Sequence, residues 1–310
     1  MRIAFAGTPQ VAVPALDTLV DSHHDVVGVI TRPDAAAGRG KKLRPSDVAV
    51  RADELGLPVL KPDHPRDQDF QDALRQWDVE AVAVVAYGAL LPTSALELVP
   101  HGWVNLHFSL LPRWRGAAPV QRAILAGDPK TGATTFRIVK PLDAGPVYRS
   151  VTMLISSTAT AGQLLDELGL AGGPLLVSTF DDIAAGVEPR PQPEEGITTA
   201  AKILTEDAHI DWTEDAGQVS RQVRAVTPVP GAWGLLHGEV FKVEQIAEPH
   251  DPWQVPELGP GQLHADKRHL WCGTGTHPLE LVRVKAAGKR SMAGADWARG
   301  VQLDAGSLLT

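Results

Sequence analysis

The first half of the chain alternates between short apolar runs and segments with helical spacing. Arg2–Ala6 is short and apolar, Ala12–Ser22 places its apolar residues at helical spacing, and Asp25–Thr31 is rich in β-branched residues. Together they predict a βαβ unit, in which a helix crosses between two parallel strands. Ala81–Ala86 is apolar throughout, as a strand covered on both faces of a sheet would be. This alternation predicts a doubly wound α/β domain with a mainly parallel sheet.

Further elements extend this pattern along the chain. Trp103–Leu106 and Thr134–Ile138 have the composition of strands, and Thr158–Ala185 has helical spacing. A helix is also predicted over Ser46–Leu55, with Ser46 as its N-cap and Gly56 just past its end.

Alternating prolines mark a boundary after this region. The stretch 187–196 carries prolines at every second position near its start, which forbids a helix and favours an extended connector. We therefore predict a first, α/β domain over 1–186, a Pro-rich linker over 187–204 and a C-terminal domain over 205–310.

The C-terminal region has a different periodicity. A helix predicted at Asp215–Ala225 precedes two apolar runs around His237-Gly238, which is a hairpin signal, and further short β-type runs follow. About five short strands suit a small OB-like β-barrel. The β pattern alone does not separate such a barrel from another small sheet.

The location of the protein can be estimated from what the sequence contains. In the 310 residues no apolar run reaches the roughly eighteen needed to cross a bilayer, and Gly7 and Pro9 interrupt the first apolar stretch too early for a signal peptide. Cys272 is the single cysteine, so no internal disulfide can form. We expect a cytoplasmic protein in which Cys272 is packed as a small hydrophobic residue.

The net charge of −8 disfavours a general affinity for nucleic acid, because phosphate binding depends on Lys and Arg. The segment Arg32–Arg51 departs from this average charge. Six cations stand against Asp34 and Asp47 in this segment, a local net charge of +4, and they are Arg32, Arg39, Lys41, Lys42, Arg44 and Arg51. Any contact with a polyanion should be confined to such a site. A solvated cationic loop is the alternative explanation.

A dense polar and Gly/Pro-rich cluster contains Asn105 and His107, which are two residues apart in a predicted strand. Side chains at this spacing project from the same face, and the carboxyl end of a parallel strand is the usual place for a ligand. Asp143 follows a later strand; it is either a turn former or, if it approaches His107, a partner that favours and orients the imidazolium. The alternative for the first pair is a strand-end cap and a half-buried imidazole. If all three converge, they can support acyl transfer to an amine.

These residues lie in motifs that resemble a known family. The motifs are Asn105-x-His107-x-Ser109-Leu110-Leu111-Pro112, then Arg113-Trp114-Arg115-Gly116, and later Leu142-Asp143-Ala144-Gly145. This signature resembles that of the folate-dependent formyltransferases. Ile3–Pro9, Arg32–Leu43 and Val85–Gly88 are most similar to the members that act on initiator tRNA. The similarity continues through Lys202-Ile203 and Ile210–Trp212 to Pro228, so it covers nearly the whole chain.

The resemblance implies an enzyme that transfers the formyl group of 10-formyltetrahydrofolate to the α-amine of methionyl initiator tRNA, for translation initiation. It implies a Rossmann-like formyltransferase domain and an OB-like domain that helps to hold tRNA. Asn105, His107 and Asp143 would be catalytic, with Asn105 and a protonated His107 donating to the developing oxyanion. The proton of the amine would leave through water or through His107.

The resemblance also implies two sets of binding residues. Those for the formyl donor would be Ser109, Leu110, Leu111, Pro112, Tyr87 and Gly88, and those for RNA would be Arg39, Lys41, Lys42 and Arg44. We expect no metal, because the sequence has no His-Glu-x-x-His and no cysteine cluster. We also expect neither a membrane nor DNA as a partner.

The sequence departs from the family pattern in two places. Val139-Lys140-Pro141 stands where an acidic residue and Gly are common, and Thr199–Lys202 lacks the usual Tyr and Pro.

Other functions are compatible with parts of the sequence. A dinucleotide-dependent dehydrogenase is disfavoured, because Gly7-Thr8-Pro9 is not Gly-x-Gly-x-x-Gly. A non-catalytic RNA-binding module would bind without transferring a formyl group. Formyltransferases of amino-sugar nucleotides or glycinamide ribonucleotide have no need of the basic loop.

Overall fold

The computed structural model describes residues 1–37, 42–249, 255–301, 303 and 306–310, which form two compact units. The first unit comprises Met1–Pro119, Lys130–Leu154 and Leu165–Ala200, and the second comprises Val120–Pro129, Ile155–Leu164 and Ala201–Thr310. Within the described ranges, none of the helices combines the length and the apolar character that spanning a membrane requires.

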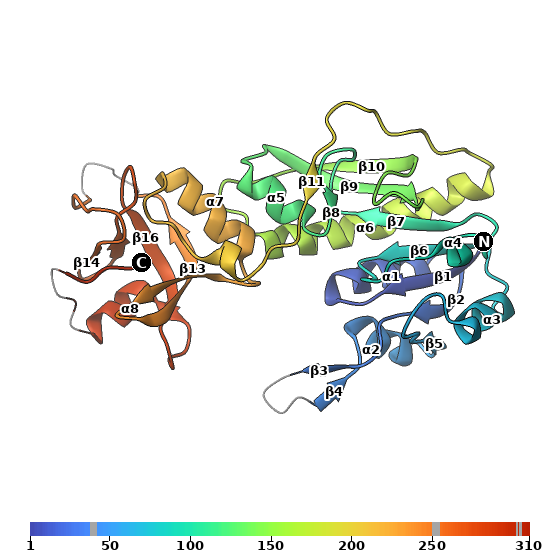
Figure 1. Ribbon diagram of the computed structural model, residues 1–310, viewed down its shortest axis with the longest axis horizontal. Coiled ribbons are helices and arrows are strands. Elements are labelled where there is room, and N and C mark those ends of the chain that lie inside the picture. Colours follow the sequence, from blue (N-terminus) through green and yellow to red (C-terminus); the bar gives the residue numbers. More distant parts are fainter. Residues whose placement is uncertain (38–41, 250–254, 302, 304–305) are drawn as a thin grey trace. The chain divides into compact units, whose positions relative to one another are not determined.

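A seven-stranded sheet forms the centre of the first unit (Figure 1). In the order β10-β9-β7-β6-β1-β2-β5, its strands are Val147–Leu154, Lys130–Arg137, Trp103–His107, Ala81–Val85, Arg2–Gly7, Asp25–Ile30 and Val59–Leu60. The five strands from β7 to β5 are parallel, whereas β9 is antiparallel to β7 and to β10. The predicted mainly parallel α/β sheet is therefore confirmed.

Helices and short 3₁₀ turns connect these strands. They are η1 (Gln10–Ala12), α1 (Val13–Val20), α2 (Asp47–Glu54), α3 (Gln68–Gln76), α4 (Thr93–Leu96), α5 (Pro119–Leu125) and α6 (Ala161–Ala184). Helix α2 begins as predicted, since the Ser46 hydroxyl accepts a hydrogen bond from the Ala49 amide at 3.0 Å. Helix α6 packs very close to β7, because Gly172 has no side chain: a Cβ there would lie 2.3 Å from Leu106.

Two short strand pairs lie outside the main sheet of the first unit. Strands β3 (Ala35–Ala37) and β4 (Lys42–Arg44) form a hairpin from the basic segment. Strands β8 (Arg115–Gly116) and β11 (Thr199–Ala200) pair in parallel and join the loop after β7 to the end of the Pro-rich segment.

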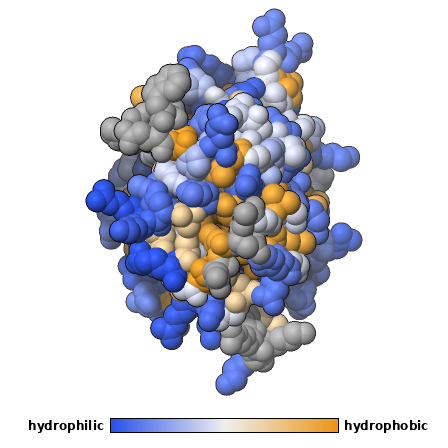
Figure 2. Space-filling model, turned by 90° about the vertical axis from the view of Figure 1, so that its left-hand side faces the viewer, coloured by the Kyte–Doolittle hydropathy of each residue, from blue (hydrophilic) through white to orange (hydrophobic). Residues whose placement is uncertain are grey.

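The second unit contains an antiparallel sheet in the order β12-β13-β16-β15-β14, with β17 paired to β16. Its elements are η2 (Glu206–Ala208), α7 (Ala216–Val226), β12 (Ala232–Leu236), β13 (Glu239–Ala247), β14 (Leu263–Ala265), β15 (Leu270–Cys272), β16 (Leu279–Lys285), β17 (Met292–Ala293) and α8 (Gly294–Arg299). The predicted small β domain is confirmed, and its sheet is antiparallel. Figure 2 looks onto this unit, where hydrophilic side chains surround a smaller group of apolar ones.

Local chemistry explains how this second sheet is built. His237 and Gly238 both have positive φ, 52° and 81°, as the two-residue turn between β12 and β13 requires. Leu309 bridges Leu236, and its neighbour Leu308 bridges Gln262 just before β14. One short segment therefore joins both edges of the sheet, which is how a small barrel protects its edges.

Candidate functional site

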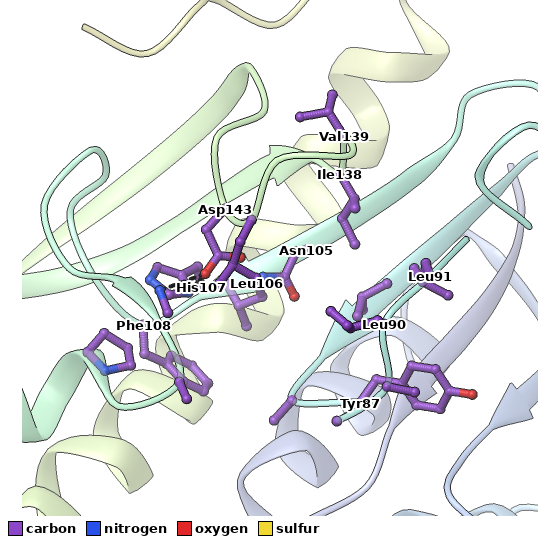
Figure 3. Close-up of a pocket in the computed structure, with 18 of the residues that line it drawn as sticks. Tyr87, Leu90, Leu91, Asn105, Leu106, His107, Phe108, Ile138, Val139 and Asp143 are labelled. Carbon is purple, nitrogen blue, oxygen red and sulfur yellow. Dashed lines mark hydrogen bonds and ion pairs between the residues drawn. The ribbon is translucent and has the colours of Figure 1, made fainter. Parts of the chain in front are cut away.

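A cavity of about 540 Å³ opens at the carboxyl ends of β6 and β7, in the first unit (Figure 3). It is lined by Val84, Ala86, Tyr87, Gly88, Ala89, Leu90, Leu91, Asn105, Leu106, His107, Phe108, Gly116, Ala117, Pro119, Ile138, Val139, Lys140, Leu142 and Asp143. The volume lies within the usual range for small-molecule sites, and most of the lining is apolar. The structure thus brings Asn105, His107 and Asp143 to one cavity.

Strand β7 presents Asn105 and His107 on one face. Asn105 pairs with Phe136 and His107 with Thr134 in the register with β9, so the two side chains share the alternation that the sequence predicts. Within the described part of the chain, the side-chain amide of Asn105 has no hydrogen-bond partner, and in Figure 3 it points toward the cavity beside Asp143. An amide in this position is free to bind a ligand.

His107 is held in one orientation by the backbone of the loop after β7. Its side chain is 6% exposed, and its Nε2 lies 2.8 Å from the carbonyl oxygen of Trp114. Because a carbonyl oxygen only accepts, Nε2 carries the proton and donates it. The other ring nitrogen, Nδ1, lies 3.8 Å from Oδ2 of Asp143. A neutral His107 therefore has its lone pair on Nδ1, on the side of the carboxylate.

Burial governs the protonation of His107. Desolvation is the largest influence and lowers the pKa of the imidazole, while the Asp143 charge and the Trp114 carbonyl act in the opposite direction. The neutral form is favoured before reaction. This differs from the sequence expectation of a protonated donor, because the sequence did not reveal how deeply β9 and the following loop bury the ring.

Asp143 is held by a loop with unusual backbone geometry. Its φ is +48°, in the left-handed region, and its Oδ2 accepts a hydrogen bond from the Gly116 amide at 2.8 Å. Asp143 is therefore more than a turn former, since its carboxylate also faces His107. The hydrogen bond from the Gly116 amide keeps one oxygen of the Asp143 carboxylate aligned toward the His107 ring.

The end of the Pro-rich segment supports the loop that carries Trp114 and Gly116. The Trp114 amide donates to Oγ1 of Thr198 at 2.8 Å, and the Arg115 amide donates to the Thr198 carbonyl. Gly116 has a φ of +129°, and a Cβ there would lie 2.6 Å from the Ala200 carbonyl oxygen. Only glycine allows this close approach. The approach positions the Gly116 N–H group, which donates a hydrogen bond to the Asp143 carboxylate.

The predicted donor-binding residues fall into two groups. Tyr87 and Gly88 line the cavity, whereas Ser109, Leu110, Leu111 and Pro112 are not among its lining residues in the described chain. Ser109 is fully buried and its hydroxyl donates to the Arg113 carbonyl, so it braces the loop. Burial raises the pKa of Tyr87 to about 12, and in Figure 3 its ring points away from Asn105.

The sequence analysis missed the apolar part of the lining. Leu90, Leu91, Phe108, Ile138 and Val139 all face the cavity. They lie in the loops after β6, β7 and β9. The sequence signal that could have identified them was apolar residues in loops at the ends of buried strands. Leu90, one of the lining residues, is 81% exposed, which is unusual for a large apolar residue and fits a role in ligand contact.

Two of the four predicted RNA-binding residues lie on strand β4 of the β3–β4 hairpin. Lys42 and Arg44 are exposed on β4, while Arg39 and Lys41 lie outside the described residues. Among the residues that the structure describes, one group could offer three metal ligands within 4.8 Å of one another, namely His23, His24 and Asp181. None of these three lines the cavity.

Two family models match the chain. The model described as "Formyl transferase" matches residues 1–179, and that described as "Formyl transferase, C-terminal domain" matches residues 202–302. Curated relatives named "Methionyl-tRNA formyltransferase" include one from Nocardioides sp., 53% identical over 99% of this chain and 97% of its own length. A second, from Streptomyces coelicolor, is 54% identical over 99% of this chain and 98% of its own length.

Solved structures show the same fold at low identity. HypX from Aquifex aeolicus in complex with tetrahydrofolic acid aligns with a TM-score of 0.68 and 17% identity, covering 96% of this chain. This chain spans 46% of that protein. Methionyl-tRNA formyltransferase from Clostridium thermocellum aligns with a TM-score of 0.57 and 14% identity, covering 80% of this chain and 94% of its own.

Proposed function

This chain belongs to the formyl transferase family, and we propose that it transfers the formyl group of 10-formyltetrahydrofolate to the α-amine of methionyl initiator tRNA. The product is N-formylmethionyl-tRNA, which is used in the cytoplasm to initiate translation. The observation that carries the proposal is the convergence of Asn105, His107 and Asp143 on one cavity. The choice of acceptor is supported by relatives above 50% identity that are named for this reaction.

The cavity suits a folate donor. Apolar side chains such as Leu91, Ile138 and Val139 offer flat contact surfaces for an aromatic ring system, and the volume of about 540 Å³ accommodates a ligand of this size. The donor supplies a formyl carbon bonded to nitrogen, and this carbon must lie near Asn105 for transfer. Tyr87 and Gly88 contact the donor at the cavity wall. Ser109–Pro112 lie outside the cavity lining in the described chain, and Ser109 supports the loop after β7 through its hydrogen bond to Arg113.

His107 acts as the base in this mechanism. The attacking α-amine loses a proton as its bond to the formyl carbon forms, and Nδ1 of neutral His107 accepts it, while Nε2 stays bonded to Trp114. The resulting imidazolium faces the Asp143 carboxylate at 3.8 Å, which stabilises the new charge. The same proton then passes to the folate nitrogen that leaves the formyl carbon. The geometry therefore favours His107 over water for the proton.

Asn105 stabilises the oxyanion. Its side-chain amide lines the cavity without a hydrogen-bond partner among the described residues, so its N–H groups are available to the formyl oxygen as negative charge develops there. Such a donor contributes most when water is excluded, and the apolar lining provides that environment.

The β3–β4 hairpin is the proposed contact for tRNA. Lys42 and Arg44 are exposed on β4, next to Arg39 and Lys41 in the sequence, and their cationic groups suit the RNA backbone. Replacing Lys42 and Arg44 with Ala should reduce affinity for charged tRNA and leave donor binding intact. Each lost phosphate contact should flatten the slope of log affinity against log salt by roughly 0.7 to 0.9. An unchanged slope would contradict the proposed tRNA contact and would favour the alternative, a solvated cationic loop.

The function is tested by measuring formyl transfer to different acceptors. Wild-type protein is supplied with 10-formyltetrahydrofolate and either methionyl initiator tRNA, methionyl elongator tRNA or free methionine. Preferential formylation of the initiator tRNA is expected. Equal rates on free methionine would contradict the proposal, as would tRNA binding without transfer. An amino-sugar nucleotide as a fourth acceptor separates this enzyme from formyltransferases of small substrates.

A further inference from the structure

Gln192, in the Pro-rich segment, uses its whole side-chain amide to join two loops of the site. Its Oε1 accepts from Nε and Nη2 of Arg115 at 3.1 and 2.7 Å. Its Nε2 donates to the carbonyl oxygens of Asp143 and Gly145, both at 2.8 Å. A primary amide has two N–H donors and one oxygen with two lone pairs. Every hydrogen-bonding position of Gln192 is therefore filled.

The loop that Gln192 holds has little freedom once it is docked. Gly145 lies against the backbone of Arg137 so closely that a Cβ would be 1.7 Å from the Arg137 carbonyl oxygen. Asp143 has a positive φ, which no regular helix or strand supports. Gln192 binds the carbonyl group of Asp143 itself and that of Gly145, two residues later. It thereby fixes the direction in which the Asp143 carboxylate leaves the loop.

The second loop held by Gln192 carries the partners of the catalytic pair. Arg115 lies between Trp114, whose carbonyl accepts from His107, and Gly116, whose amide donates to Asp143. A closed ring of contacts thus runs from Gln192 to Asp143, to Gly116 and through Arg115 back to Gln192. Such a ring sets the spacing between the carboxylate and the imidazole on which the base depends.

We propose that Gln192 is a positioning residue for formyl transfer, which holds the Asp143 carboxylate against His107 by tying the Asp143 loop to the Arg115 loop. The inference rests on the proposed function, because it concerns the same pair of residues. Gln192 itself does not line the cavity. It acts through Asp143 and not on the substrate.

Anchoring of the Pro-rich segment does not require Gln192. Val147 and Arg190 exchange two backbone hydrogen bonds, of 2.7 and 2.8 Å, two residues before Gln192. Thr198 and Ala200 pair with the loop after β7 by their backbones on the other side. Loss of the Gln192 amide should therefore change the site more than the fold. This distinguishes a positioning role from simple attachment of the segment.

The main test is Gln192→Met, which keeps the length of the side chain and removes all four hydrogen bonds. We expect kcat for formyl transfer to fall roughly ten- to a hundredfold, because small misplacement of a catalytic group has effects of this size. KM for both substrates should stay close to the wild-type values. Glu195→Gln is the matched control, since Glu195 is exposed in the same segment and has no hydrogen bond or ion pair with the described residues.

The pH profile supplies a measurement that a structural defect would not move. His107 must be neutral to accept a proton, so kcat falls as pH drops through its pKa in the reacting complex. The groups around the ring are the Asp143 carboxylate, the Trp114 carbonyl and the edge-on Phe136 ring, with Lys140 elsewhere on the cavity wall. Loosening Asp143 weakens its pull on the imidazolium, so the acid limb should move to lower pH.

A double-mutant cycle with Asp143→Asn completes the test. If Gln192 acts through the Asp143 carboxylate, Gln192→Met should cost little more in the Asp143→Asn background. A wild-type kcat in Gln192→Met, an unmoved acid limb, or costs that multiply in the double variant would each overturn the inference. Should Gln192→Met not fold, Gln192→Glu serves in the cycle, since it keeps the acceptor for Arg115 and loses the donors. If wild-type protein transfers no formyl group, the proposed function itself is wrong, and the inference about Gln192 is wrong with it.

Discussion

Replacing Asp143 with Asn tests the central electrostatic interaction of the site. The substitution keeps the size of the side chain, and the Asn oxygen can still accept the hydrogen bond from the Gly116 amide. What is lost is the negative charge 3.8 Å from Nδ1 of His107. The loop should stay in place while the stabilisation of the imidazolium disappears.

The size of the effect follows from that distance. Two unit charges about 4 Å apart interact by about 4 kcal/mol at an effective dielectric constant of about 20. This would be about a thousandfold in rate, because each 1.36 kcal/mol is a factor of about ten. Only part of the positive charge has formed in the transition state, and the Asn dipole retains some attraction. We therefore expect kcat to fall roughly 10²- to 10³-fold.

The assay is kcat for formyl transfer to charged tRNA across a pH series, with Asp63→Asn as a control because Asp63 is an exposed acid outside the cavity. Loss of the Asp143 charge lowers the pKa of His107, so the acid limb should move to lower pH. The acceptor amine titrates identically with both enzymes, so the comparison isolates the protein. A folded Asp143→Asn enzyme with more than a tenth of wild-type kcat, or with an unmoved limb, would refute the argument.

Three further predictions follow from single side chains. Asn105→Ala should lower kcat by roughly 10²- to 10³-fold while changing the free energy of unfolding by less than about 0.5 kcal/mol, and a smaller loss of kcat would remove Asn105 from the oxyanion site. Ser46→Ala should cost about 2–3 kcal/mol in urea unfolding, because it removes the cap on the Ala49 amide and leaves the buried Thr31 hydroxyl without its 2.7 Å partner; a cost below about 0.5 kcal/mol would contradict this. Burial lowers the pKa of His24 in the folded protein. The stability that neutral His24 contributes is therefore complete above its pKa in the unfolded chain, about 6.5, and is lost as the pH falls toward its pKa in the folded protein. His24→Gln should flatten this acid loss between pH 7.5 and 5.5 in urea titrations, and an equally steep loss would count against it.

The fold was predictable where local chemistry decides the structure. Strands β1, β2 and β6 and helix α2 lie within one or two residues of their predicted bounds, because continuous apolar runs and N-caps act over a few residues. Strand β10 was not identified. It is an edge strand whose side chains are mostly half-buried or exposed, so its sequence lacks the apolar run of a central strand.

The candidate site was predictable in composition but not in its contacts. The spacing of Asn105 and His107 shows a shared face, and the family motif adds Asp143. The protonation of His107 depends on burial by distant residues, which no motif reports. Gln192 was hidden because it lies 49 residues from Asp143 in a segment whose prolines mark it as a connector. Hydrogen bonds over such separations are set by tertiary packing.

The pairing of Thr198 and Ala200 with the loop after β7 has a consequence for the order in which the site is made. At 5–20 residues per second, roughly three to eleven seconds pass on the ribosome between synthesis of Asp143 and of Ala200. During that time the nascent chain holds Asn105, His107 and Asp143 without the residues that brace their loops. A fragment ending at residue 186 would remain in this state permanently. Such a fragment should fold its sheet and yet transfer formyl groups more slowly than the full chain.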